Sequence, residues 1–468
     1  MTKYLAIDMG ATSIRGILGV YEDGQISFEE VMRYNHEMVA KDGINYWNID
    51  GLLENIYKTV IEHGGTIESI GVDTWGVDYG LIDDEGNLVA SPMAYRNDIY
   101  AKGLASIEDK ISLKDLYLKT GNQIMDINTL FQLETLRKEH PDLLDKAKVI
   151  LMTPNLINYF LSGEKYGEKT ICSTSQMFDL EAGDWNYKLF EDLGFDKDLL
   201  PEVTEKTVIG STKNSSNDEI NKFDIKVLQV PSHDTASATY LTEAYDNLDT
   251  LFISSGTWSL VGCFTDNPII TEESYNYDLT NETGFAGKNM FFKNITGLYL
   301  IEQLKKAIEA KEGQKLSFDE ITRRVHETED FSYYVDVYDE ELNKQTDDFI
   351  GVFEKYLDDN AYQKSVDPME YFRLLYQSIV ESYVEVVEYI EHILDRKFKK
   401  AHIIGGGSQS EILCQLVADK LGLAVIAGPK EATGMGNILS QVEILEGREA
   451  SLKLREYILN SEEIKIYK

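Results

Sequence analysis

Apolar and polar positions alternate along this chain in short blocks that predict strands and helices in turn. Residues 3–9 and 14–21 are apolar or alternating runs, and the small residues at 10–13 predict a tight hairpin between them. From Asn48 to His63 apolar residues recur at helical spacing, with Asn48 as the expected N-cap. Residues 67–74 return to a strand pattern. Strand–helix alternation of this kind predicts an α/β fold that binds ligands at strand ends.

The last quarter of the chain repeats the alternation. A long helix is expected from about Pro368 to Leu394, followed by a strand at 401–404 and three consecutive glycines. A further helix to Leu421 and a strand at 423–427 complete the pattern. The glycines therefore lie between a strand and a helix, where many α/β proteins bind their ligands.

An internal repeat links the two halves. Residues 7–16 and 253–262 share Ile, Gly, Ser and Gly at the same offsets, and both lie in a strand–turn–strand context, 246 residues apart. Self-similarity at so long a period indicates two related domains rather than a solenoid. We place them at 1–244 and 245–468, with a polar link at 245–247.

The net charge of the chain excludes some classes of binding partner. The 468 residues include 81 acidic and 45 basic side chains, a net charge of −36, which argues against nucleic acid and against an anionic membrane surface. The three cysteines support neither a disulfide framework nor a zinc site, and we see no targeting segment or spanning apolar run. We expect a cytoplasmic protein, monomer or homodimer, with small-molecule partners.

Two hairpin turns are candidate phosphate sites. The chain has no Walker-type P-loop and no G-x-G-x-x-G opening a helix. Gly10 and Gly256 instead allow backbone N–H groups to converge, and hydroxyls stand beside them at Thr12, Ser13, Thr257 and Ser259. Either turn alone is more simply an ordinary hairpin. The presence of both at matching places favours phosphate binding.

Three further segments carry candidate chemistry, each with a plainer interpretation. Asp234 precedes a helical run, where capping is favoured from the residues alone over a general base. Gly405–Gly407 suits either a nucleotide base or ribose, or tight helix–strand packing. Residues 73–80 combine carboxylates with Trp75, as in sugar sites, although a half-buried Trp with solvated acids explains them equally well.

These segments together resemble the FGGY carbohydrate kinases of the actin-like ATPase clan, and most closely the branch that acts on L-rhamnulose. The matching segments are Asp8–Ser13, Asp73–Asp78, His233–Ala238, Ser254–Leu260, Asn294–Leu298, Gly405–Gln409, Glu431–Thr433 and Gly436–Ile438. They occur in the expected order and span both halves.

The resemblance implies two ribonuclease-H-like α/β domains around an interdomain cleft that closes on sugar and ATP. The N-terminal domain would bind the sugar and carry the first phosphate motif and the base, and the C-terminal domain the second phosphate motif and the adenosine motif. The implied reaction, a step of rhamnose metabolism, transfers the γ-phosphoryl group of ATP, with Mg²⁺, to the 1-hydroxyl of L-rhamnulose. The products are L-rhamnulose 1-phosphate and ADP.

The resemblance also assigns residues. Asp234 is implied as the base, which overrides the capping preference, and Asp8 as the residue that orients the metal. The expected sugar-binding residues are Gly80, His233, Thr235, Asn294, Asp73, Trp75 and Asp78. The expected nucleotide-binding residues are Ala11, Thr12, Ser13, Ile14, Arg15, Gly256, Thr257, Glu302, Gly405, Gly406 and Gly407.

Two positions depart from the family pattern. Asn97 stands where relatives have Asp, and Glu302, followed by Gln303, stands where relatives have a nucleotide-binding Gln. A kinase for another ketose, such as L-fuculose or L-xylulose, therefore remains an alternative. A nucleotide-switched binding protein of the same clan is a further one, although no segment is left over for a peptide-binding domain.

Overall fold

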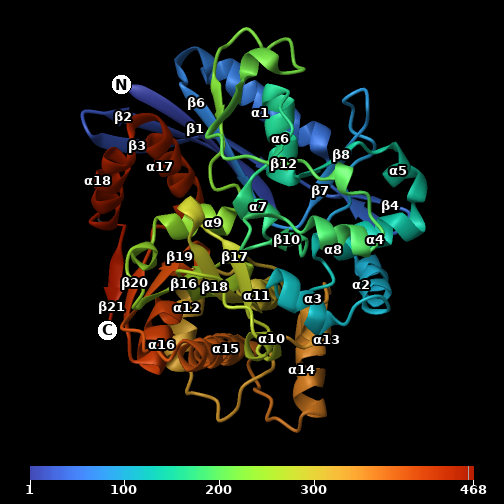
Figure 1. The fold of residues 1–468 in the computed structure, drawn as a ribbon. Coiled ribbons are helices and arrows are strands. Elements are labelled where there is room, and N and C mark those ends of the chain that lie inside the picture. Colours follow the sequence, from blue (N-terminus) through green and yellow to red (C-terminus); the bar gives the residue numbers. More distant parts are fainter. Residues whose placement is uncertain (462) are drawn as a thin grey trace. The chain divides into compact units, whose positions relative to one another are not determined.

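Two strand–turn–strand segments start the two sheets of the protein at the predicted places. The computed structural model describes residues 1–461 and 463–468, and it has β1 at Thr2–Met9 and β2 at Ser13–Glu22 (Figure 1). The second pair is β15 (Thr250–Ser255) and β16 (Trp258–Thr265). A backbone hydrogen bond closes each turn, from Gly10 N to Ser13 O at 2.9 Å and from Gly256 N to Trp258 O at 2.8 Å. Both predicted hairpins are confirmed.

The two sheets share one pairing pattern. The first runs, in spatial order, β13 (Val208–Ser211), β14 (Lys226–Leu228), β6 (Ser69–Thr74), β1, β2 and β3 (Gln25–Asn35). The second contains, in spatial order, β18 (Asn289–Thr296), β16, β15, β19 (Lys400–Ile404), β20 (Ala424–Ala427) and β21 (Lys465–Tyr467).

In both sheets the first hairpin strand pairs antiparallel with the second and parallel with the strand on its other side, β6 or β19. The next pair is parallel again, and the last is antiparallel. The internal repeat of the sequence therefore corresponds to a repeat of strand topology.

Residue contacts divide the chain into two units, each built from three segments. The first contains Met1–Leu241, Thr265–Phe291 and Ala432–Ser461. The second contains Thr242–Phe264, Phe292–Glu431 and residues 463–468. Segments from both halves of the sequence thus return to the first unit, and the domain division at 244/245 stays a prediction. Tyr245, expected in a polar link, is buried at the end of a 3₁₀ turn, Glu243–Tyr245.

Short strand pairs and a dozen helices complete the first unit. The pairs are β4 (Val39–Lys41) with β5 (Ile44–Tyr46), β7 (Tyr79–Ile82) with β8 (Val149–Met152), β9 (Tyr166–Gly167) with β12 (Glu202–Val203), and β10 (Phe178–Asp179) with β11 (Asp184–Trp185); β17 is Thr280–Thr283. The helices are α1 (Ile49–His63), α2 (Ala101–Glu108), α3 (Leu113–Thr120), α4 (Thr129–Glu139), α5 (Pro141–Lys146), α6 (Thr153–Ser162), α7 (Lys169–Cys172), α8 (Tyr187–Asp192), α9 (Asp234–Tyr240), α10 (Glu272–Asn276), α17 (Ala432–Glu446) and α18 (Arg448–Leu459). As predicted, Asn48 caps α1, because its side chain accepts the Gly51 N–H at 3.1 Å.

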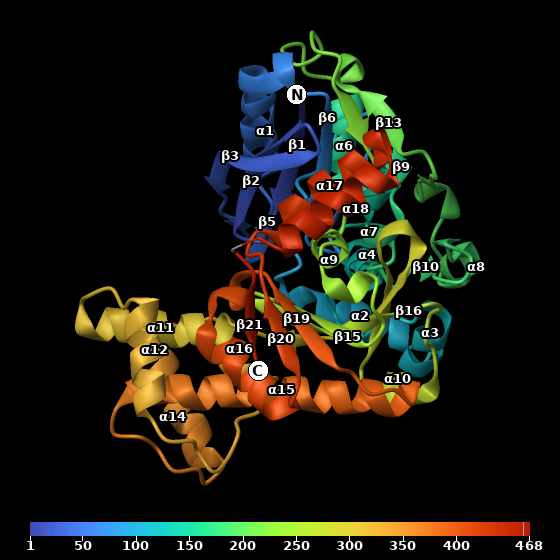
Figure 2. The same cartoon turned by 90° about the vertical axis from the view of Figure 1, so that its left-hand side faces the viewer.

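The second unit has its own helices. They are α11 (Tyr299–Glu312), α12 (Phe318–Glu327), α13 (Glu340–Asn343), α14 (Phe349–Asp359), α15 (Tyr371–Leu394) and α16 (Glu411–Leu421). The predicted long helix is confirmed as α15, the long orange helix of Figure 2. Among the residues that the structure describes, no helix is both long and apolar enough to span a membrane.

Side-chain alternation gives the first sheet one apolar face and one chemically active face. Along β1, Leu5, Ile7 and Met9 enter a core with the apolar residues of α1 and α6. The neighbouring positions face α17, which contacts both β1 and β6 and is seen lying over the sheet in Figure 2. Asp8 and Asp73 are register partners on β1 and β6, so their side chains share this second face.

Candidate active site

Asp234 is the first residue of α9 and not its N-cap. His233 occupies the cap position with extended backbone and no side-chain capping bond, and Asp234 Oδ1 accepts the N–H of Thr235 at 2.6 Å. Tertiary contacts fix this start, because Thr74 N donates to Ser232 O and His233 N donates to Thr170 Oγ1. The capping interpretation is therefore wrong by one residue, and the Asp234 carboxylate is left available for chemistry.

Burial is the main cause that raises the pKa of three carboxylates, Asp8, Asp73 and Asp234. Burial raises the pKa of Asp8 to about 6, against the effect of Arg15, whose guanidinium donates to Asp8 Oδ2 at 2.6 Å, and Asp234 adds to the rise. Burial and then the charge of Asp8 raise the pKa of Asp73 well above its usual value. Burial also raises the pKa of Asp234, opposed by His233, by the Thr235 N–H and by Arg15.

Asp73 and Asp78 are fully buried, so the interpretation of solvated acids beside a half-buried Trp is wrong. Asp73 Oδ2 accepts from Asn437 Nδ2 at 2.6 Å, whereas Asp73 Oδ1 has no hydrogen-bond partner among the described residues. Asn437 lies on α17, 364 residues away in sequence, and only its position in the family motif pointed to it.

Asp78 organises the aromatic residues beside it. Its Oδ2 accepts from the indole N–H groups of Trp47 and Trp75 at 2.6 and 2.9 Å and from Tyr95 N at 3.2 Å. Its Oδ1 accepts from Gln132 Nε2 at 3.0 Å. Burial raises its pKa to about 6 in spite of these donors. With four protein donors already bound, Asp78 is better placed to fix the two tryptophans than to contact a sugar.

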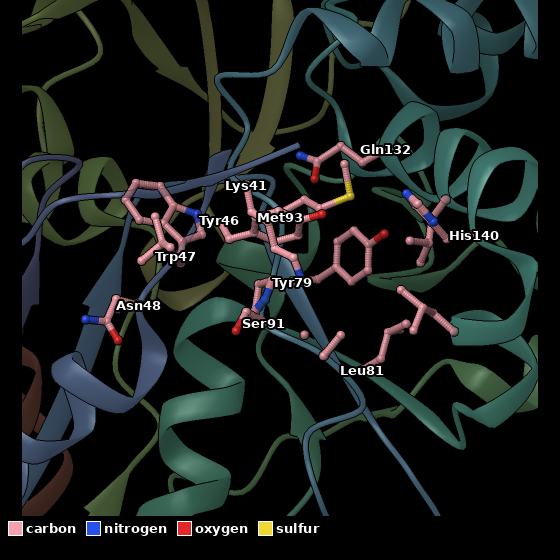
Figure 3. Close-up of a pocket in the computed structure, with 16 residues that line it drawn as sticks. Lys41, Tyr46, Trp47, Asn48, Tyr79, Leu81, Ser91, Met93, Gln132 and His140 are labelled. Atoms are coloured by element: carbon pink, nitrogen blue, oxygen red, sulfur yellow. The ribbon is translucent and has the colours of Figure 1, made fainter. Parts of the chain in front are cut away.

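Gly80 is separate from the residues around Asp234. It lies on β7 opposite Leu151, and a Cβ there would meet Leu156 at 2.7 Å, which explains the glycine by packing. It lines a cavity of about 370 Å³ together with Trp47, Gln132 and His140 (Figure 3). His233, Asp234 and Thr235 are not among the 16 lining residues.

Gly76 adjoins the strand end that meets His233. It follows β6, two residues after Thr74, which forms a parallel bridge with His233. The next residue, Val77, has φ of 68°, a strained conformation for a β-branched side chain that is typical of functional sites. Thr174 Oγ1 accepts from Val77 N and Thr129 donates to Val77 O, so the strained turn is held from both sides.

The first predicted phosphate turn presents its backbone, the hydroxyls of Thr12 and Ser13, and the guanidinium of Arg15. Thr12 is exposed and Ala11, Ser13 and Arg15 are half-buried, whereas the side chain of Ile14 lies in the core. Ile14 can therefore contribute only its backbone to a ligand. His36 Nε2 lies 3.0 Å from Gly10 O and supports the turn from within.

The second turn is anchored from inside its own unit. Ser259 is buried, with its hydroxyl 2.5 Å from the hydroxyl of Tyr383 on α15, so it faces away from any phosphate. Leu298 N donates to Gly256 O and Gly297 N to Thr257 O, at 2.8 and 3.0 Å. These bonds tie the turn to the start of α11 and leave Thr257 half-buried.

Of the three glycines after β19, two are explained by tight packing and one is accessible to a nucleotide. Gly405 has φ of 78°, and a Cβ on Gly405 or Gly407 would crowd Ser255, so both pack tightly. Gly406 is exposed, and a Cβ there would make only an ordinary contact, 3.9 Å from Ser255 O, which leaves its outer side accessible to a ligand. Asn294, on β18, is half-buried.

Residues 302 and 303, where the chain departs from the family pattern, differ in burial. On α11, Glu302 is exposed, whereas Gln303 is buried and donates to the Tyr299 hydroxyl at 2.8 Å. Gln303 is therefore committed inside the unit. Glu302 alone faces outward at the family's nucleotide position.

The residues around Asp8 fit a hydrated cation. The described residues contain no group of three or more His, Cys, Asp or Glu side chains arranged as metal ligands. Mg²⁺ in nucleotide sites uses one or two carboxylates together with water and phosphates. The carboxylates of Asp8 and Asp73, with a buried oxygen of Asp73 unpartnered, supply the negative charge that such an ion requires.

Family models match nearly the whole chain. The N-terminal domain of the FGGY family of carbohydrate kinases matches residues 3–238, and its C-terminal domain matches residues 251–442. The chain belongs to the FGGY family of carbohydrate kinases. This FGGY kinase is therefore a sugar kinase, and kinases of this family use ATP, typically with Mg²⁺.

Curated relatives and solved structures agree with the family. A protein named rhamnulokinase from Halalkalibacterium halodurans is 33% identical over 471 residues, covering 100% of this chain and 99% of the relative. A rhamnulokinase from Bacillus subtilis is 31% identical, covering 99% and 95%. A gluconate kinase from Lactobacillus acidophilus and a Plasmodium falciparum glycerol kinase with ADP superpose with TM-scores of 0.80 at 13% and 14% identity, covering 100% of this chain and 93% and 94% of theirs. These structures show the fold of the FGGY kinase.

Proposed function

We propose that this FGGY kinase phosphorylates the 1-hydroxyl of L-rhamnulose with ATP and Mg²⁺, giving L-rhamnulose 1-phosphate and ADP. The observation that carries the proposal is the full-length similarity, at 31–33% identity, to several proteins named rhamnulokinase. The solved sugar kinases that are named for other substrates share only 12–15% identity with this chain. The assignment to L-rhamnulose rests on that contrast.

In the proposed reaction Asp234 accepts the proton of the attacking hydroxyl. The hydroxyl oxygen forms a bond to the γ-phosphorus, the bond from that phosphorus to the β–γ bridging oxygen breaks, and ADP departs with that electron pair. A carboxylate at the first turn of a helix is favoured in its charged form by the helix dipole, which suits a proton acceptor. The proton then leaves the carboxylate to solvent after the products dissociate.

Backbone groups and a few side chains bind the phosphates. The N–H groups of residues 11–15 and of Gly256 and Thr257, with the hydroxyl of Thr12 and the charge of Arg15, are the proposed phosphate ligands. Gly405–Gly407 would bind the adenosine, with the exposed Gly406 closest to it. Asp8 would hold Mg²⁺ through water, and the ion, when bound, neutralises phosphate charge.

For the sugar we propose His233, Thr235, Asn294, Trp75 and the backbone of Gly76. Gly76 replaces Gly80, because Gly76 adjoins the strand end beside His233 whereas Gly80 is explained by packing against Leu156. Asp73 and Asp78 would not contact the sugar directly. Asp73 would contribute its charge, and Asp78 would position the two tryptophans that donate to it.

A panel of ketoses in an ADP-release assay tests the substrate. L-rhamnulose is expected to give the highest kcat/KM among L-rhamnulose, L-fuculose, L-xylulose and D-xylulose. A clear preference for one of the other ketoses would replace L-rhamnulose in the proposal. ATP hydrolysis that no sugar accelerates would favour the nucleotide-switched binding protein instead.

A further inference from the structure

Glu282 is a buried carboxylate that none of the sequence motifs singles out. It lies on β17 and is 6% exposed, and its Oε2 lies 3.0 Å from Nδ1 of His233. On the other side of the ring, His233 Nε2 lies 3.4 Å from Oδ1 of Asp234. The imidazole of His233 therefore stands between two carboxylates, one of which is the proposed base.

His233 Nδ1 and Glu282 Oε2 approach each other without the alignment of a hydrogen bond, and the contact is an ion pair when His233 is protonated. His233 Nδ1 and Glu282 Oε2 are both buried, and neither has a hydrogen-bond partner among the described residues. A buried charge with no partner is strongly unfavourable, so each group depends on the other for compensation. Without the Glu282 charge, the protonation of His233 would depend on its other neighbours.

Glu282 is held in place by the residues on either side of it. Asn281 N donates to Gly121 O at 2.8 Å, and Asn122 Nδ2 donates to Asn281 O at 3.0 Å. Thr283 N donates to Ser173 Oγ at 2.9 Å. A strand residue anchored on both sides has little freedom to move, which suits a residue that must orient another.

The charged groups with the largest effect on His233 are acidic. Burial alone would lower the pKa of His233, but the negative charges of Glu282, Asp234 and Glu168 outweigh it, and the pKa is raised. Glu168 binds the Thr170 hydroxyl and three backbone N–H groups, so its carboxylate is already engaged. His233 and Arg15 lower the pKa of Asp234. The charge of Asp234 in turn raises the pKa values of Asp8, Asp73 and Tyr95.

We propose that Glu282 is a positioning residue of the phosphoryl transfer: it holds His233 in its protonated form beside Asp234, and the positive ring keeps Asp234 ionised and oriented to receive the hydroxyl proton. This inference rests on the proposed function only in taking Asp234 as the base. The proton passes from the sugar hydroxyl to the Asp234 carboxylate, and His233 keeps its own proton throughout.

Two titrations limit the reaction on this view. Activity rises with pH as Asp234 becomes ionised and falls again as His233 loses its proton. Replacing Glu282 by Gln removes the negative charge that favours the imidazolium, so His233 loses its proton at lower pH. His233 is still protonated at the lower pH where Asp234 ionises, so the acid limb of the pH–kcat profile moves little. The alkaline limb moves toward it by about one pH unit, since an opposite charge within ~4–6 Å is worth about 1–3 units.

The test compares Glu282→Gln, Glu282→Asp and the wild type, with Glu181→Gln as a control at an exposed acid. Glu282→Gln is expected to lower kcat near pH 7 by about tenfold or more, as loss of a partner that orients a catalytic ligand does. KM for ATP should be unchanged. Glu282→Asp should restore most of the limb separation, and Glu181→Gln should match the wild type.

A sugar-free measurement separates this inference from the proposed substrate. NMR titration of the histidine rings in the full-length protein, with His233 assigned from a His233→Gln variant, should show the His233 pKa falling in Glu282→Gln and recovering in Glu282→Asp. The kinetics use the ketose that performs best in the panel, so a wrong sugar leaves the test intact. Failure of the panel therefore does not count against Glu282.

Several results would overturn the inference. Unchanged limbs and an unchanged His233 titration, with only a lower melting temperature, would make Glu282 a structural residue. If Glu282→Gln still lowers kcat as much in a His233→Gln background, Glu282 does not act through His233. If Glu282→Gln does not fold, the inference is tested with Glu282→Asp and with the titration of His233 in the wild type. A wild-type His233 with a pKa below the ordinary histidine value would contradict the inference.

Discussion

At the scale of single residues, the candidate chemistry depends on which carboxylates are already engaged. Asp78 and Glu168 each accept four hydrogen bonds from the protein and are committed to structure. Asp234 makes only local bonds to Thr235, and about a third of its side chain is exposed. Asp8, Asp73, Asp78 and Glu168 are buried, so Asp234 is the most accessible of these five acids for proton exchange with a substrate.

Asp234→Asn tests this assignment. An amide of the same shape keeps the sugar contacts but accepts no proton, so kcat is expected to fall by about 10²–10⁴-fold with little change in the KM for sugar. Steady-state kinetics with the preferred ketose measures both. Asp109→Asn, at an exposed acid at the end of α2, is the matched control and should behave as the wild type. Near-normal turnover of Asp234→Asn would remove this residue from the mechanism.

At the scale of elements, a helix from the C-terminal end of the chain supports the site. Helix α17 contacts α9, β1 and β6, and it places Asn437 on Asp73 and Gln441 on Ser69 and Leu5 O. The close approach requires small residues, because a Cβ on Gly436 would overlap the carbonyl oxygen of Ser237 on α9. The position of Asp234 therefore depends on a helix about 200 residues later in sequence.

Gly436→Ala is expected to move α9 and α17 apart. The extra methyl group meets backbone and cannot be relieved by a rotamer change, so we expect a loss of about 1–3 kcal/mol in the free energy of unfolding. The kcat should fall as well, because α9 begins at Asp234. Urea denaturation and steady-state kinetics report the two effects. Gly65→Ala, where a Cβ meets nothing within 4 Å, is the control, and equal behaviour of the two variants would contradict the packing argument.

At the scale of the whole molecule, buried acids and net charge act on stability in the same direction. With a charge of −36, lowering the pH relieves repulsion among surface carboxylates and favours the compact state. Burial also raises the pKa of Asp8 and of Asp78 to about 6. The folded protein therefore binds more protons than the unfolded chain between about pH 4 and pH 6. Its free energy of unfolding should decrease as the pH rises through this window.

The Asp78→Asn variant isolates one buried group from the general charge effect. Asn does not titrate, so the fall in the free energy of unfolding between pH 5 and pH 7.5 should be smaller in the variant. The expected difference is about 1.4 kcal/mol, because about one pH unit of this window lies below the Asp78 pKa of about 6 and each unit is worth about 1.4 kcal/mol. Urea unfolding of both proteins at the two pH values gives the difference, in which surface repulsion cancels. Parallel pH dependence of the two proteins would show that Asp78 has an ordinary pKa in the fold.

The sequence by itself determined the elements and their repetition. Hairpins at residues 10–13 and 256–257, helix α1 with its cap at Asn48, helix α15 and the glycines after β19 all follow from local patterns of apolar, polar and small residues. Such patterns fix backbone geometry within a few residues. The repeat between residues 7–16 and 253–262 also anticipated the shared strand topology of the two sheets, because related segments form the same pairs.

Only the tertiary structure decided which side chains are buried and what they meet. Burial of Asp73 and Asp78, the start of α9 after His233, and the role of α17 depend on strands and helices far apart in sequence. Glu282 lies 49 residues from His233, and no local pattern marks it as its partner. Contacts of this kind arise from packing between elements, which a single sequence encodes only jointly, so the surroundings of the proposed base appear first in the folded protein.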